Sequence, residues 1–347
     1  MFLIIFSLFL VTYAYKPLSN NFLRRIPSGG SDFDPLYGSL LSPILIPRIP
    51  STVGHSTVQH HFVDFFSKEL PRWTIKWYNS TSRTSSGTEI PISNLVFERE
   101  PPWTKQGQAN WLTLAAHYDS KILPEELVGA TEAVPCAILM HVARSIDRYV
   151  SQMHDEMAEL GEGGTVEMDM GVQILLLDGK EGFDEMGPAL YGSRTLSETW
   201  EKKTNPVGSN YPNALSQISM FVLLDGLGTV NPTIPSYVPI THWAHKNMAN
   251  IESRMRKIDL LETRIPSSPF LPWTYETTRQ AETMDDFVPF MDRGVPTLHL
   301  LPLHLVPNGS TRDDDVKHLD VRTIRDWAKI VTGFALEWLD MMEVEPE

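Results

Sequence analysis

Ionisable side chains gather at the ends of four short apolar runs in this sequence. Imidazole and carboxylate groups brought together in this way are the usual ligands of zinc, and a His-x-Asp pair lets the carboxylate orient the imidazole ring. The runs cover residues 111–116, 172–178, 218–225 and 297–303. The ionisable residues that accompany them are His117, Asp119, Glu132, Asp178, Lys180, Glu181, Asp225, Asp285, Asp286 and His304. This pattern predicts a metal site, or an acid–base site, assembled from several segments of the chain.

The four apolar runs are predicted to be strands of a parallel sheet. They are short and mostly continuous, which is typical of strands covered on both faces. Residues with helical spacing separate the runs, at 134–149, 194–203, 241–261 and 320–341. This alternation predicts a single α/β domain with a mostly parallel central sheet and helices on both faces. Ligands of open α/β sheets bind beyond the carboxyl ends of the strands, where all four polar ends fall.

The N-terminal residues have the features of a secretory signal peptide. An apolar run from Phe2 to Val11 precedes small residues, and cleavage is expected after Ala14. The run is too short to cross a bilayer as a helix, and no later stretch predicts a stable membrane span. We therefore expect residues 1–14 to be a signal peptide and the protein to follow the secretory pathway to the extracellular space. A buried N-terminal segment and a retained anchor are the alternatives.

The rest of the chain is predicted to form an irregular lead-in followed by one domain. Residues 15–54 are rich in Pro, Ser and Gly, which favours irregular structure. The α/β domain is expected to cover residues 55–343. Ser56 or Thr57 is the expected cap of its first helix, and Asp320 the expected cap of its last.

Composition narrows the possible partners. The 347 residues carry a formal net charge of −14, which argues against nucleic acid as a partner, because phosphates require a basic face. The single cysteine, Cys136, excludes an intrachain disulfide. Two sequons, at Asn79 and Asn308, predict N-glycosylation sites.

Long motifs spread over residues 50–340 resemble glutaminyl-peptide cyclotransferase, or glutaminyl cyclase, of the zinc aminopeptidase-like family. They include "LTLAAHYDSK", "VGATEAVPCAILMHVARSID", "LLLDGKEGFDEMGPALYGSR", "FVLLDGLG", "DDFVPFMDRGVPTLHLLP" and "DDDVKHLD". The resemblance implies an enzyme that converts the N-terminal glutamine of peptides or proteins to pyroglutamate and releases ammonia. It also implies one zinc ion, a glutamate that shuttles the proton, and a monomer.

The resemblance assigns roles to individual positions. Asp225 and Asp285 match the two aspartates that bind the substrate's α-amine and support the proton relay. Glu181 matches a zinc ligand, and Glu132 stands where the family has a zinc-binding aspartate. The extra methylene of Glu132 moves its oxygens by about 1.5 Å, which is large for a metal bond. Ser310 stands at the position of the zinc-binding histidine, so we do not expect it to be a ligand.

Lys180 stands at the position of the general base. An ammonium accepts no proton near neutral pH unless its pKa falls by several units, and neighbouring carboxylates would raise it. Loss of a general base typically costs about 10²–10⁴ in rate. We therefore expect a weak or inactive cyclotransferase. Our hypothesis is that the ammonium of Lys180 lies near the metal position and offsets the surrounding carboxylates. The alternative is a lysine that turns out to solvent.

Two other readings remain open. His117, Glu132 and Asp225 match a second metal position of two-zinc aminopeptidases, which would make the protein a zinc-dependent peptide hydrolase. His304 or His318 is a candidate replacement for the missing zinc histidine. The third reading is a non-catalytic homologue that binds peptides. Because one expected zinc ligand is lost and one altered, the sequence leaves open whether zinc binds.

Overall fold

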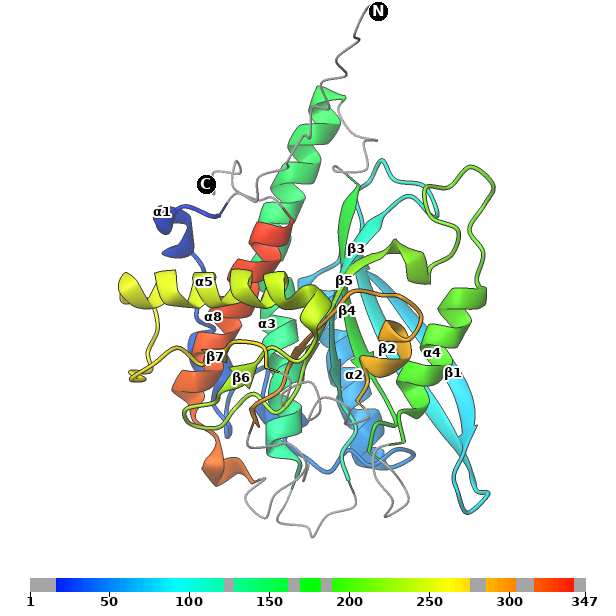
Figure 1. Cartoon of the computed structure of the whole chain (residues 1–347). Helices are drawn as coiled ribbons and strands as arrows, with labels where there is room; N and C mark the ends of the chain where they lie inside the picture. Colours follow the sequence, from blue (N-terminus) through cyan, green and yellow to red (C-terminus); the bar gives the residue numbers. More distant parts are fainter. Residues whose placement is uncertain are drawn as a thin grey trace, which may run out of the picture.

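A computed structural model describes residues 17–121, 128–161, 169–181, 189–274, 285–303 and 315–339. Within these ranges a six-stranded sheet has the order β1-β2-β4-β3-β5-β8, and β6 and β7 form a second, two-stranded sheet (Figure 1). The two strands of the small sheet are Ile234–Pro235 and Phe270–Leu271.

The four predicted strands are confirmed, and they form the parallel part of the large sheet. They are β3 (Asn110–His117), β4 (Met170–Leu177), β5 (Ile218–Leu224) and β8 (Thr297–Leu300). His117 pairs with Leu177, and Leu224 pairs with Leu300. This register brings the residues that follow each strand to one edge of the sheet.

A hairpin that the sequence analysis did not identify makes the sheet mixed. Strands β1 (Thr74–Arg83) and β2 (Glu89–Arg99) pair antiparallel, and β2 pairs antiparallel with β4. Three of the five strand pairings are parallel, so the sheet is mostly parallel, as predicted. β1 is an edge strand whose side chains are exposed or half-buried, and it therefore lacks the apolar run that revealed the central strands.

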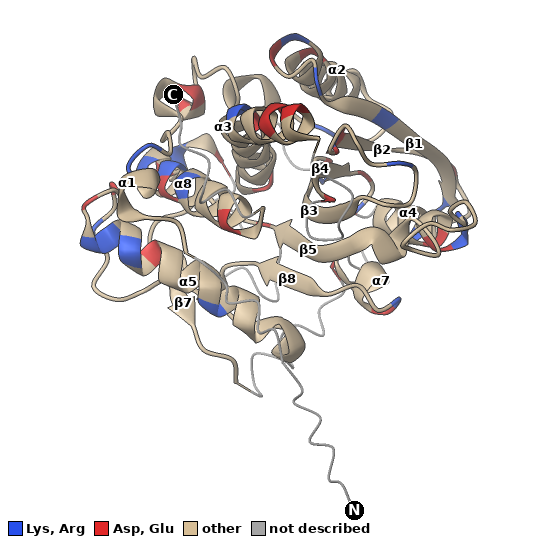
Figure 2. Cartoon of the chain, turned by 90° about the horizontal axis from the view of Figure 1, so that it is seen from above, with Lys and Arg blue, Asp and Glu red and all other residues tan. Residues whose placement is uncertain are grey.

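Helices cover both faces of the sheet, as predicted (Figure 2). One core layer lies between the sheet and α2 (Val53–Glu69), α3 (Ala130–Leu160), α5 (His242–Lys257) and α8 (Val321–Trp338). The other lies between the sheet and α4 (Tyr191–Lys202) and α7 (Val288–Met291). Short 3₁₀ turns complete the described structure at Leu215–Gln217, Pro239–Thr241 and Val316–His318.

Two predicted helix ends need correction. The cap of α2 is Thr52 and not Ser56 or Thr57. The hydroxyl of Thr52 accepts a hydrogen bond from the backbone N–H of His55. The helix predicted at 134–149 is the longer α3, which starts before Pro135 and ends at Leu160. The predicted cap Asp320 is confirmed, because its side chain accepts a hydrogen bond from the N–H of Arg322.

The lead-in is irregular, as predicted, but it belongs to the domain core. It contains α1 (Asn20–Leu23) and 3₁₀ turns at Gly30–Phe33 and Ser42–Ile44. Leu18, Phe22, Phe33, Leu41 and Ile44 are buried in the same core layer as α3 and α8. Residues 17–54 therefore pack as part of the same folded unit as these helices.

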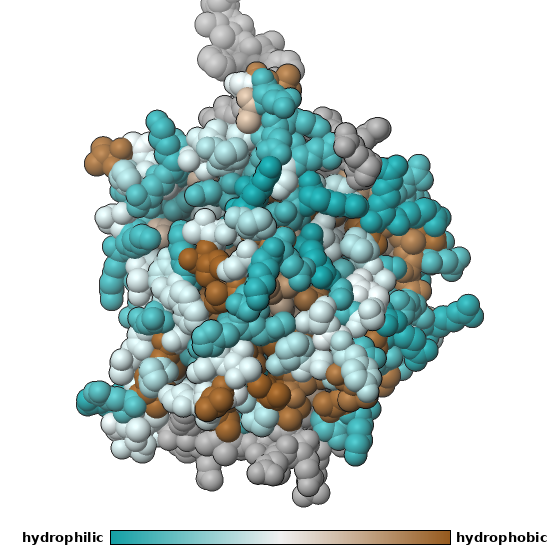
Figure 3. Space-filling view, turned by 180° about the vertical axis from the view of Figure 1, so that it is seen from behind, coloured by the Kyte–Doolittle hydropathy of each residue, from teal (hydrophilic) through white to brown (hydrophobic). Residues whose placement is uncertain are grey.

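The surface of the molecule is mostly polar on the face seen in Figure 3. Seen from behind, hydrophilic side chains dominate, and apolar side chains gather in small groups (Figure 3). Among the described helices, none has the length and apolar character needed to cross a membrane.

Candidate active site

Five ionisable side chains from separate segments meet at the carboxyl ends of the parallel strands. His117 ends β3, Lys180 follows β4, Asp225 follows β5, Asp285 precedes α7, and His299 lies within β8. All five are buried, with Lys180 only 8% exposed. The structure thus brings together His117 and the three residues predicted as catalytic, Asp225, Asp285 and Lys180.

Lys180 forms ion pairs with both aspartates. Its Nζ lies 2.5 Å from Asp225 Oδ2 and 3.0 Å from Asp285 Oδ1. Burial opposes the charged ammonium, but Asp225 and Asp285 hold the pKa of Lys180 well above its usual value. Burial likewise raises the pKa of Asp225, yet Lys180 and His117 lower it below the usual range. Lys180 is therefore a charged partner of the two aspartates.

His117 supplies a second positive charge. Its Nε2 lies 3.5 Å from Asp225 Oδ1, and its Nδ1 lies 3.4 Å from Asp119 Oδ1. Burial and Lys180 lower the pKa of His117, but Asp119 and Asp225 raise it well above its usual value. The ammonium of Lys180 and the imidazole of His117 therefore both face Asp225 at the centre of the site.

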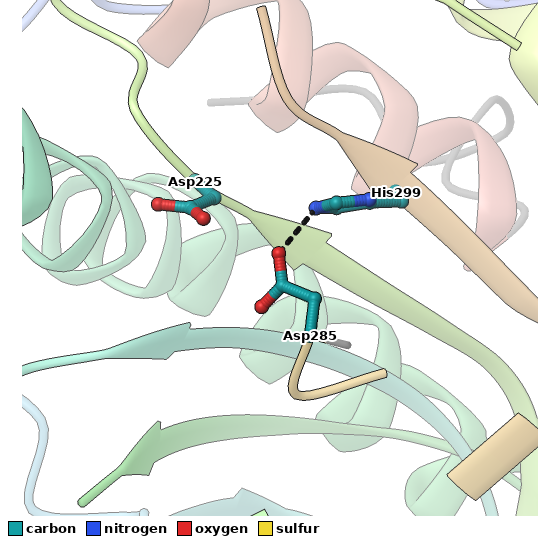
Figure 4. A group of neighbouring side chains, drawn as sticks. All are labelled: Asp225, Asp285 and His299. Carbon is teal, nitrogen blue, oxygen red and sulfur yellow. Dashed lines mark ion pairs between the residues drawn. The ribbon is translucent and has the colours of Figure 1, made fainter. Parts of the chain in front are cut away.

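His299 is a site residue that the sequence analysis missed. Its Nε2 lies 3.1 Å from Asp285 Oδ2 (Figure 4). Burial raises the pKa of Asp285, while Lys180 and His299 hold it below its usual value. Next to it, burial and Asp285 raise the pKa of Asp286 to about 7. The only sequence signal for His299 was one polar residue inside an apolar strand.

Backbone hydrogen bonds fix the turn that presents Lys180. The preceding Gly179 has φ +71°, a conformation that favours glycine, and a Cβ there would lie 2.6 Å from the side chain of Ile92. Lys180 O accepts a hydrogen bond from Ala189 N at 2.9 Å. Asp119 Oδ2 accepts one from the N–H of Glu181, also at 2.9 Å. The ammonium is consequently held inward by the residues on either side of it.

Asp178 anchors the start of the same turn. Its two carboxylate oxygens contact His55 Nε2 at 2.9 Å and accept a hydrogen bond from Ser93 N at 2.8 Å. Burial raises the pKa of Asp178, and His55 opposes that rise. Asp178 therefore ties β4 to α2 and β2, and it supports the site from outside the central cluster.

The two glutamates expected as metal ligands, Glu132 and Glu181, are both buried. Glu181 Oε2 lies 3.1 Å from Lys121 Nζ. Glu132 is buried in the first turn of α3. Its Oε2 packs against Gly129, where an added Cβ atom would lie only 2.6 Å away. Ser310, His304 and Asn308 lie outside the described residues, so their predicted roles stay predictions. Asn79 is exposed on β1.

Among the described residues, one group has the spacing of a metal site. Donor atoms of Asp225, Asp285 and His299 all lie within 4.8 Å of one another (Figure 4). Zinc requires donor oxygens and nitrogens at about 2.0–2.2 Å. However, the ammonium of Lys180 already contacts both aspartates of this group. The donor atoms of this group are of the kind that zinc prefers. However, the group cannot accommodate a zinc ion while the ammonium of Lys180 occupies this position.

Comparison with known proteins identifies relatives for most of the chain. The profile of Peptidase family M28 matches residues 94–335. A glutaminyl-peptide cyclotransferase-like protein of Bos taurus is 33% identical over 92% of this chain and 79% of its own length. A glutaminyl-peptide cyclotransferase of Gloydius blomhoffii is 31% identical over 87% of this chain and 80% of its own length.

Solved structures agree on the fold. A glutaminyl cyclase of Macrostomum lignano superposes with a TM-score of 0.77, covers 96% of both chains and is 24% identical. A Zn-dependent exopeptidase of Parabacteroides distasonis has a TM-score of 0.57 at 16% identity, over 88% of this chain and 98% of its own. The sequence matches extend across the site segments. The chain belongs to peptidase family M28 and to the family of the glutaminyl-peptide cyclotransferases.

Proposed function

We propose that this chain is a glutaminyl-peptide cyclotransferase-type protein that recognises peptides with N-terminal glutamine and turns them over slowly. The observation that carries the proposal is the contact of Lys180 with Asp225 and Asp285. The names of its relatives support the reaction type, and the altered site supports the low rate.

The internal ammonium competes with the substrate. In the related enzymes, by resemblance, the aspartates at these two positions receive the α-amine of the peptide. Here the two carboxylates already bind an ammonium that belongs to the chain itself. A peptide amine must displace a tethered competitor whose effective concentration is high. The same substitution removes the carboxylate that would take the proton from the attacking amine.

The peptide-hydrolase reading is less well supported. It requires neutral His117 to bind a metal together with Glu132 and Asp225. Both ring nitrogens of His117 instead face carboxylates, and Asp119 and Asp225 raise its pKa well above its usual value despite burial and Lys180. A protonated imidazole has no free lone pair for a metal.

The proposal also covers the localisation and processing of the protein. We infer a secreted monomer, processed after Ala14 and glycosylated at Asn79. The apolar N-terminal run and the sequon support this part. The exposure of Asn79 on an edge strand leaves room for a sugar.

Reversion of the altered positions tests the proposal. The triple variant Lys180→Glu, Ser310→His, Glu132→Asp is compared with wild type for ammonia release from a Gln-initiated dipeptide, with zinc supplied. Restoring the base alone is worth about 10²–10⁴ in rate, so we expect a gain of at least about 100-fold in kcat/KM. Mass spectrometry identifies pyroglutamyl peptide or cleavage products. Equal rates for the two folded proteins, or cleavage in place of cyclisation, would contradict the proposal.

A further inference from the structure

We propose that Lys180 is the resident cation of this site, and that Asp225, Asp285 and His299 bind a divalent transition metal only when the ammonium of Lys180 is removed. The inference deepens the proposed function and rests on its interpretation of Lys180. It concerns metal binding and stability, so it can fail separately from any claim about turnover.

The contacts place the ammonium where an added cation would bind. Lys180 Nζ bridges Asp225 and Asp285, at 2.5 and 3.0 Å, and the three side chains are at most 10% exposed. Burying two neighbouring carboxylates without a counter-charge is strongly unfavourable. The lysine supplies that counter-charge from within the chain. It therefore performs the structural part of the work that a bound metal would otherwise do.

In the structure Lys180 is buried and paired with both aspartates, and it does not turn out to solvent. Tyr191 N donates to Gly179 O at 3.0 Å, and Ala189 N donates to Lys180 O at 2.9 Å. The next residue, Glu181, donates its N–H to Asp119. Since the backbone on both sides of Lys180 is fastened, the side chain projects into the pocket from a fixed point.

His299 provides the feature that points to a metal. His299 is 2% exposed. Among the described residues, its Nδ1 has no hydrogen-bond partner, and its Nε2 has none apart from the carboxylate of Asp285. Its Nε2 is directed at Asp285 (Figure 4). One imidazole and two carboxylates form a mixed nitrogen and oxygen donor set, which suits Zn²⁺ or Co²⁺ better than Ca²⁺ or Mg²⁺.

This donor set differs from the one that the family resemblance predicts. The resemblance points to Glu132, Glu181 and the position of Ser310. In the structure Glu181 pairs with Lys121, and neither glutamate joins the donor group. Removal of the Lys180 ammonium would therefore create a metal site whose ligands differ from those that the family resemblance predicts.

The experiment measures melting temperature and zinc binding after chelator treatment, without any substrate. Lys180→Met keeps an unbranched side chain that is one heavy atom shorter and removes the charge. Lys121→Met is the matched control at the neighbouring ion pair. We expect the wild type to bind no zinc stoichiometrically and to keep its Tm with chelator or with zinc. For Lys180→Met we expect Tm to fall by roughly 5–10 °C without metal. Added zinc should restore it with one ion bound, and Lys121→Met should behave as the wild type.

Two further variants complete the test. Adding His299→Ala to Lys180→Met should abolish or strongly weaken the gained zinc binding, which assigns the ligand. If Lys180→Met does not fold without metal, Lys180→Gln replaces it, because the amide still donates hydrogen bonds without carrying a charge. One zinc bound tightly by the wild type would overturn the inference, and so would folded Lys180→Met or Lys180→Gln protein that takes up no zinc.

Discussion

The ammonium of Lys180 lies 2.5 Å from Asp225 and also contacts Asp285 at 3.0 Å, although the chain belongs to a family of cyclotransferases. By resemblance, position 180 would hold a proton-shuttling carboxylate and the two aspartates would receive the substrate amine. A single substitution thus changes both the charge at the base position and the availability of the amine site.

Reversing the charge at position 180 should destabilise the protein when metal is absent. Lys180→Glu places a third carboxylate beside Asp225 and Asp285, and we expect the free energy of unfolding to fall by about 3–5 kcal/mol. Urea denaturation with a chelator present measures this change. Lys180→Arg, which keeps the positive charge, is the control and should lose less. Unchanged or higher stability of Lys180→Glu with the chelator present would refute the role of Lys180 as a substitute cation.

Arg48 should be indispensable for the fold around the site. The side chain is buried, and its guanidinium donates to the carbonyl oxygens of Ile44, Ile46, Tyr118, Val128 and Gly129, at 2.8–2.9 Å. These bonds join the lead-in to the end of β3 and the start of α3.

Arg48→Met leaves these buried carbonyl groups without their donor, so we expect a loss of at least about 3 kcal/mol in unfolding free energy. Arg83→Met is a matched control, because Arg83 forms an exposed pair with Glu89 and should change stability by at most about 1 kcal/mol. Equal effects of the two substitutions in urea denaturation would contradict this account of Arg48.

His154 should make the protein sensitive to acid. Its side chain is buried, and burial, followed by Arg99, lowers its pKa to about 3, although Asp155 opposes the shift. The unfolded chain binds a proton at about pH 6.5, so between pH 6.5 and 3 the unfolded state holds more protons than the folded state. The stabilising contribution is complete above pH 6.5 and is lost as the pH falls.

The size of this effect can be isolated with one variant. Between pH 7.5 and 5.0 the wild type should lose roughly 2 kcal/mol more unfolding free energy than His154→Met, which cannot take up the proton. Denaturation at the two pH values measures the difference, and other histidines contribute equally to both proteins. Parallel pH profiles would show that His154 is not buried in its neutral form.

The sequence predicted those parts of the molecule that depend on local pattern. Continuous apolar runs identified the four parallel strands, and the residues at the ends of two of them identified Lys180 and Asp225. The family resemblance identified Asp285. Strand β1 was not predicted because an edge strand buries few apolar side chains. His299 was not predicted because a single imidazole in an apolar strand usually belongs to the core. Arg48 could not be assigned, since its carbonyl partners are up to 81 residues away. Its role depends on tertiary contacts that leave no mark on local spacing.

Ammonia release by the wild-type protein tests the central claim most directly. The protein is assayed at high concentration with a Gln-initiated dipeptide, once with excess zinc and once with a chelator. With Lys180 in place of the base and the metal, we predict slow ammonia release whose rate is the same with zinc and with the chelator. Rapid ammonia release that requires zinc and is abolished by the chelator would contradict the account, because it would mean that Lys180 does not block the site.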